Sequence, residues 1–99
     1  MKVIKIDCRK IKDWDSFHDV FAKACGFPKS YGRNLDAWID CMGDLKEDMS
    51  IIQLNYVESM ARRCPEIFQA INDCTAFVNF REIEQGHPVR LAVAYQKDN

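Results

Sequence analysis

Six residues in the middle of the chain, SIIQLN (Ser50–Asn55), decide the fold because they separate two long helical regions. This short apolar run predicts a strand. Near the start, KVIKID alternates apolar and charged residues, which predicts a strand over Lys2–Cys8. VRLAVAY predicts another over Val89–Tyr95, with every second side chain on one face. The sequence therefore predicts one strand in the middle of the chain and one near each end.

Two helices are expected between the first and second strands. Apolar residues recur at three- and four-residue steps over Trp14–Ala24. Asp13 or Asp15 can cap the start of that helix, and Gly26 can end it. Asn34 is a good N-cap for a second helix over about Leu35–Met42, which Gly43 closes. Both helices belong to the connection that leads to the middle strand.

The second connection is also helical. A helical stretch is expected from about Val57, and Pro65 breaks or restarts it. Asn72 or Asp73 could cap a further helix that Gly86 stops. Strands joined by helical crossovers pair in parallel, and the crossovers are right-handed. We therefore predict an α/β fold in the order β-α-α-β-α-α-β, with a small three-stranded parallel sheet and about four helices.

Composition places the chain among ordinary globular proteins. Its 99 residues, of which 47% are hydrophobic and 29% charged, predict a single domain over residues 1–99. The formal charge of −1 argues against a nucleic-acid binder that relies on a broad basic surface. Five cysteines without a CxxC pair, no signal peptide and no apolar run of membrane length favour a cytoplasmic protein. We expect a monomer when free, with no direct contact to nucleic acid or membrane.

No motif in the sequence indicates catalysis, a metal or a cofactor. The histidines, His18 and His87, accompany no recognisable catalytic arrangement, and no cysteine–histidine spacing suits a metal. The four glycines are scattered, which leaves no glycine-rich phosphate loop. We interpret His18 as a surface or cap-proximal helix residue, whereas Tyr31 could equally pack under its loop or present its ring to a partner. We therefore expect a protein that is not an enzyme.

The helix expected over Leu35–Met42 carries two aspartates on one face. On a wheel of about 100° per residue, Asp36 and Asp40 lie about 40° apart, with Ile39 and Gly43 on the same side. The opposite arc is apolar and predicts the core face, whereas Ile39 is expected in solvent. The helix dipole favours Asp36 in the first turn but not Asp40, and the two carboxylates repel each other. Periodicity alone favours a solvated face.

The segment YGRNLDAWIDCM (residues 31–42) resembles the barstar family, small intracellular inhibitors of secreted microbial ribonucleases. The likeness continues backwards through DSFHDVFAKACGFPKSYG (residues 15–32), and FRE (residues 80–82) is similar to part of the family's last helix. The family's order of strands is the order predicted above. The resemblance covers most of the chain and is specific over residues 15–42.

The resemblance implies an inhibitor, or immunity protein, whose second helix plugs a barnase-like ribonuclease. Asp40 would enter the pocket where the enzyme holds the RNA phosphate, beside Asp36, and Glu82 would be a second acidic contact. A rigid carboxylate can imitate a phosphate because it accepts charge-assisted hydrogen bonds. The partner-binding residues implied are Tyr31, Gly32, Asn34, Asp36, Ile39, Asp40, Gly43 and Glu82.

The chain departs from the family at several contact positions. Ser30 and Ile39 stand where aromatic contacts are usual, Arg33 replaces an acid, and Leu45 follows the helix in place of an aromatic residue. Aromatic anchors are frequent binding hot spots. The partner could therefore be a secreted microbial ribonuclease, a related toxin nuclease, or another protein that binds a non-catalytic interaction module on the same fold.

Overall fold

Eight elements follow one another along the chain, and a computed structural model describes residues 1–98. The elements are β1 (Lys2–Asp7), the single-turn 3-10 helix η1 (Cys8–Lys10), α1 (Trp14–Cys25), α2 (Leu35–Gly43), β2 (Ser50–Asn55), α3 (Val57–Arg63), α4 (Pro65–Glu84) and β3 (Leu91–Tyr95). The predicted order β-α-α-β-α-α-β is confirmed, with η1 as an addition after β1.

The sheet contains three parallel strands in the order β1–β2–β3, as predicted. Ser50 of the central strand pairs with Lys2 on one side and with Leu91 on the other. β3 begins at Leu91, two residues later than predicted. There the backbone N–H groups of Arg90 and Leu91 both donate to the side-chain oxygen of Asn79, at 3.0 Å, which fixes the start of the strand to α4.

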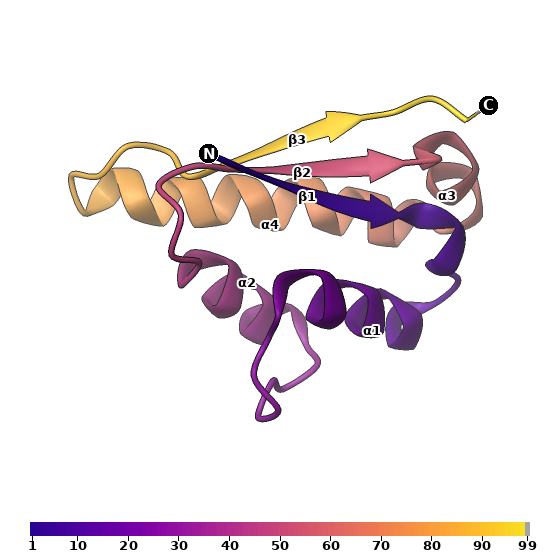
Figure 1. Ribbon diagram of the computed structural model, residues 1–99, viewed down its shortest axis with the longest axis horizontal. Coiled ribbons are helices and arrows are strands. Elements are labelled where there is room, and N and C mark those ends of the chain that lie inside the picture. Colours follow the sequence, from indigo (N-terminus) through magenta and orange to yellow (C-terminus); the bar gives the residue numbers. More distant parts are fainter. Residues whose placement is uncertain (99) are drawn as a thin grey trace.

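α1, α2 and α4 lie on the same side of the sheet, which forms the upper edge of the molecule in Figure 1, whereas α3 lies beyond the end of β2. α4 runs along the sheet, and α1 and α2 lie below it in this view. Alternate residues of β2 are buried, as expected for a sheet with one covered face. The largest buried side chains are Ile6, Ile11, Phe17, Phe21, Trp38, Met42, Ile52, Leu54, Met60, Ile67, Ile71 and Val78. Burying each stabilises the fold by roughly 1.5–3 kcal/mol before chain entropy is subtracted.

The second connection differs from the prediction in one respect. α4 is continuous from Pro65 to Glu84, so no helix begins at Asn72 or Asp73. The side chain of Asn72 instead donates to the carbonyl of Phe68 and accepts the hydroxyl of Tyr95, at 2.7 Å. A residue that usually caps helices is thus accommodated inside one because β3 supplies a partner for its side chain.

The ends of α1 and α2 are set by their flanking residues. Asp13 and Ser16 form a capping box at the start of α1, and Gly26 ends that helix in the left-handed conformation, with φ of 66°. Gly43 does not close α2 as predicted but is its last helical residue. Its carbonyl accepts a hydrogen bond from the guanidinium of Arg90, so a side chain satisfies this end of the helix.

Two further findings concern residues 1–98. In this range no helix is long and apolar enough to cross a membrane. The five cysteines are free thiols. Burial raises the pKa of Cys8 and of Cys25 to about 12, so both thiols stay protonated and behave as small apolar side chains.

Candidate functional site

The acidic helix α2 is anchored through one face and open on the other. Trp38 and Met42 are fully buried, which confirms the predicted core face. Asp36 and Asp40 are both exposed. Ile39 was predicted to lie in solvent, but it is half-buried and packs against the core, because α4 lies close to that edge of α2. The carboxylates are therefore the outward-facing groups of this helix.

A hydrogen bond that the sequence did not predict joins the loop before α2 to α1. Tyr31 Oη lies 2.5 Å from His18 Nδ1, and the ring of Tyr31 packs 4.7 Å from that of Phe27, centroid to centroid. Tyr31 therefore packs under its loop. His18 was expected to be a surface or cap-proximal residue, but it is not on the surface, because it is only 6% exposed. Burial lowers the pKa of His18, with a smaller contribution from the charge of Arg33.

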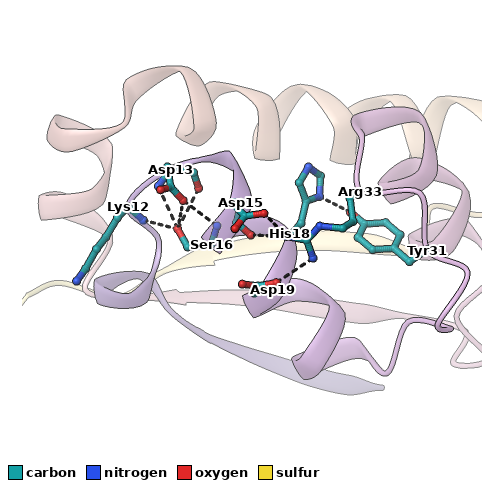
Figure 2. Close-up of polar contacts among 8 residues, drawn as sticks. All are labelled: Lys12, Asp13, Asp15, Ser16, His18, Asp19, Tyr31 and Arg33. Atoms are coloured by element: carbon teal, nitrogen blue, oxygen red, sulfur yellow. Dashed lines mark hydrogen bonds and ion pairs between the residues drawn. The ribbon is translucent and has the colours of Figure 1, made fainter.

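Arg33 joins the loop before α2 to α1 through hydrogen bonds and ion pairs. Its guanidinium donates to the carboxylates of Asp15 and Asp19, at 2.6 and 2.8 Å, and to the backbone carbonyl of Asp15, at 3.0 Å. Figure 2 shows Arg33 reaching from the loop between these two side chains. The residue has a φ of 53°, a left-handed conformation that side chains other than glycine seldom adopt. The bonds to α1 compensate for that conformation and fix the approach of the chain to α2.

Asn34 and Gly32 form the start of α2. The side-chain oxygen of Asn34 accepts the backbone N–H of Ala37 at 2.8 Å, which confirms the predicted N-cap. A Cβ atom at Gly32 would lie 3.4 Å from both Ala37 Cβ and Asn34 Nδ2, so a larger residue would press on the cap. These two predicted site residues therefore position the acidic helix.

A groove of about 290 Å³ separates α2 from α4. It is lined by Ile39, Asp40, Gly43, Asp44, Val78, Arg81, Glu82 and Gln85. Four of the predicted partner-binding residues thus meet in one place, although they come from two helices. Asp36 lies one turn before Asp40 on α2, whereas Tyr31, Gly32 and Asn34 belong to the loop that leads into this helix.

The sequence did not predict the basic side chains that contact the carboxylates of the groove, of which Arg81 lines the groove itself. Arg81 Nη1 donates to Asp40 Oδ1 at 3.2 Å, and both side chains are largely exposed. Glu82 lies 3.0 Å from Nδ1 of His87 and 4.0 Å from Nε of Arg90. Arg81 precedes Glu82 in FRE (residues 80–82), and this position signalled that a cation lies near the acidic residues. The contacts of Glu82 depend on the turn after α4, which brings His87 and Arg90 back over that helix.

The structure thus defines a class of protein: a small α/β protein that presents an acidic helix from a frame held by hydrogen bonds and ion pairs. The family model described as Barstar (barnase inhibitor) matches residues 1–94. The chain therefore belongs to the Barstar family, as its residues 31–42 predicted. No curated protein matches the chain.

Proposed function

We propose that this protein inhibits a barnase-like ribonuclease by placing the acidic face of α2 in the enzyme's phosphate-binding site. The observation that carries the proposal is the outward position of Asp36 and Asp40 on a helix whose opposite face is buried. Membership of the family described as Barstar (barnase inhibitor) supports a ribonuclease as the partner. We further propose that the protein is non-catalytic and acts in the cytoplasm as a monomer.

The chemistry of a ribonuclease site suits two exposed carboxylates. Such a site holds an RNA phosphate with cationic side chains, and a carboxylate accepts the same charge-assisted hydrogen bonds. Negative charge facing positive charge also speeds the encounter at low salt. Asp40 would occupy the phosphate position, and Asp36 would pair with the rim of the site.

Asp40 must exchange its internal partner when the nuclease binds. Its contact with Arg81 joins two largely exposed side chains, and such surface pairs typically contribute only about 0–1 kcal/mol. Close charge pairs in a desolvated interface can contribute about 1.5–7 kcal/mol, a range that comes from measurements on the barnase–barstar complex itself. The exchange therefore favours the complex.

The frame around α2 reduces the entropy that binding would otherwise remove. Arg33 holds the preceding loop to α1, Asn34 caps the start of the helix, and Arg90 bonds to its last carbonyl. Ordering a flexible loop at an interface typically costs about 0.5–1.5 kcal/mol for each immobilised side chain. A helix that is already positioned avoids most of this cost.

A second candidate is a non-catalytic interaction module on the same fold, whose partner is a different toxin or no nuclease at all. The side chains of Ser30, Ile39 and Leu45 favour it, because Ser30 is exposed but small and the other two pack partly against the core. None of the three presents a large aromatic surface to a partner. Titration of the protein into barnase separates the two candidates.

Inhibition by purified protein tests the proposal directly. We expect the wild type to abolish RNA cleavage when it is titrated into barnase, and we expect Asp40→Ala to weaken inhibition by about 2–5 kcal/mol. Asp36→Ala should have a smaller effect, because it meets the rim of the site. Glu66→Ala is the matched control, since it removes an exposed carboxylate at the other end of α4.

Two results would count against this account. If the wild type leaves cleavage by barnase unchanged, the inhibitor proposal fails and the interaction module becomes the better interpretation. If the wild type inhibits but Asp40→Ala inhibits equally well, the assignment of Asp40 to the phosphate position is wrong.

A further inference from the structure

Two phenylalanines on α4 lie largely in solvent. Phe77 is 49% exposed and Phe80 is 55% exposed, although aromatic side chains usually contribute to stability by burial. The guanidinium carbon of Arg81 lies over Phe77, 6.0 Å from the ring centroid. Aromatic residues and arginine are enriched at protein interfaces relative to the rest of the surface. The pair of Phe77 and Arg81 is therefore a candidate contact surface.

Phe77 lies on the flank of α4 that faces α2. Residues three and four apart share one side of a helix, so Cys74, Phe77 and Arg81 form a row. One end of this row meets the acidic face where Arg81 bonds to Asp40 at 3.2 Å. At the other end, burial raises the pKa of the Cys74 thiol and nearby carboxylates, including that of Asp36, raise it further. Phe77 thus lies between the points at which α4 approaches the two aspartates.

The direction of the helices agrees with this placement. α2 and α4 both run towards the left of Figure 1, so successive turns of one accompany successive turns of the other. The contacts agree with this direction, because Arg81 bonds to Asp40, and Asp44 and Gln85, each one turn later on its own helix, line the same groove. The exposed ring of Phe77 therefore adjoins the acidic face and is continuous with it.

The loop before α2 and α2 itself carry no largely exposed aromatic side chain, and all of their residues lie in the part of the chain that the structure describes. Tyr31 is half-buried and its hydroxyl is turned to His18. Trp38 is fully buried in the core. α2 thus supplies carboxylates without an exposed aromatic ring beside them, whereas the adjacent flank of α4 supplies such a ring.

We propose that Phe77 is the aromatic anchor of the acidic interface and packs against an apolar side chain that borders the partner's cationic phosphate site. The occupant is the ribonuclease of the proposed function, so this inference rests on that function. The complementarity has two parts: Asp36 and Asp40 meet the cations, and Phe77 covers the apolar surface beside them. Recognition is thereby shared between α2 and α4.

Binding kinetics on immobilised barnase test the anchor. Phe77→Ala should weaken affinity about tenfold or more, chiefly through faster dissociation, and Phe77→Leu should retain part of the affinity. Phe80→Ala is the matched control, because Phe80 belongs to the same helix and has similar exposure but is turned about 60° farther from α2. We expect this control to change affinity less than about twofold. Circular dichroism should show that every variant keeps the wild-type fold, since alanine and leucine are good helix formers.

The outcomes are distinguishable. If Phe77→Ala binds like the wild type while Asp40→Ala binds weakly, the anchor is wrong and the proposed inhibition stands. Equal losses at Phe77 and Phe80 would also overturn the anchor, because the effect would not depend on the flank that faces α2. A wild type that does not bind barnase would overturn the proposed function, and the anchor with it.

Discussion

Two acidic regions border the same groove and differ in what surrounds their carboxylates. On α2, the side chain of Asp40 is 67% exposed and lies 3.2 Å from Arg81. At the end of α4, the side chain of Glu82 is 19% exposed and lies 3.0 Å from His87 and 4.0 Å from Arg90. An exposed carboxylate can exchange its partner, whereas an enclosed one braces its own chain. We therefore expect the carboxylates that bind a partner to lie mainly on α2, and we expect Glu82 to stabilise the corner between α4 and β3.

Among the variants that test this comparison, replacement of Glu82 should change stability most. Glu82→Gln should lower the free energy of unfolding by about 1 kcal/mol, because the side chain loses the negative charge that faces Arg90 and that accepts from His87. Affinity for barnase should change less than about twofold. Urea unfolding and isothermal titration would measure the two quantities. A large loss of affinity with unchanged stability would show instead that Glu82 contacts the partner, as the family resemblance implied.

The pH dependence of stability is expected to report on the loop beneath the acidic helix. Burial lowers the pKa of His18 below its ordinary value of 6.5. The unfolded chain therefore takes up this proton at higher pH than the folded chain does. The stability that neutral His18 contributes is complete above about pH 6.5 and is lost as the pH falls towards the folded pKa.

His18→Phe tests that dependence because it keeps an aromatic ring but cannot titrate. Between pH 7 and 5, the free energy of unfolding should fall less steeply for this variant than for the wild type, as measured by urea unfolding at several pH values. Tyr31→Phe is the control, since it removes the hydroxyl that meets His18 and keeps the histidine. Identical slopes for the wild type and His18→Phe would contradict the burial of a neutral histidine.

The smallest expected effect on stability is that of Arg33, which joins the loop before α2 to α1. Arg33→Ala should leave global stability nearly unchanged, because its ion pairs are exposed. It should nevertheless speed hydrogen exchange of the Tyr31 amide, which donates to the carbonyl of Pro28 at 2.9 Å. Arg62→Ala, at an exposed position of α3, is the control. Unchanged exchange at Tyr31 would show that the loop is held without Arg33.

Much of the fold was predictable because local patterns determine it. The alternation in Lys2–Asp7 and the apolar run at Ser50–Asn55 fix two strands, and the caps Asp13 and Asn34 fix two helix starts. Helical connections between strands then impose the parallel sheet. The prediction failed at Asn72, where a partner on β3 stabilises a residue that would otherwise favour a helix end.

The site was predictable only as far as one helix carries it. Helical periodicity places Asp36 and Asp40 on one face, which the structure agrees with. The environment of Glu82 depends on residues that follow the turn after α4, and the burial of His18 depends on Tyr31, thirteen residues away. Such contacts arise from tertiary packing and leave no local pattern.

Competition with a nucleotide tests the central claim most directly, namely that the acidic face of α2 occupies the position of an RNA phosphate. The apparent Kd of the wild-type protein for barnase would be measured as a nucleotide 3′-phosphate is added at increasing concentration. If Asp40 and the phosphate share one site, the apparent Kd rises in proportion to the nucleotide, as for mutually exclusive ligands. An apparent Kd that stays constant while the nucleotide saturates the enzyme would contradict the account.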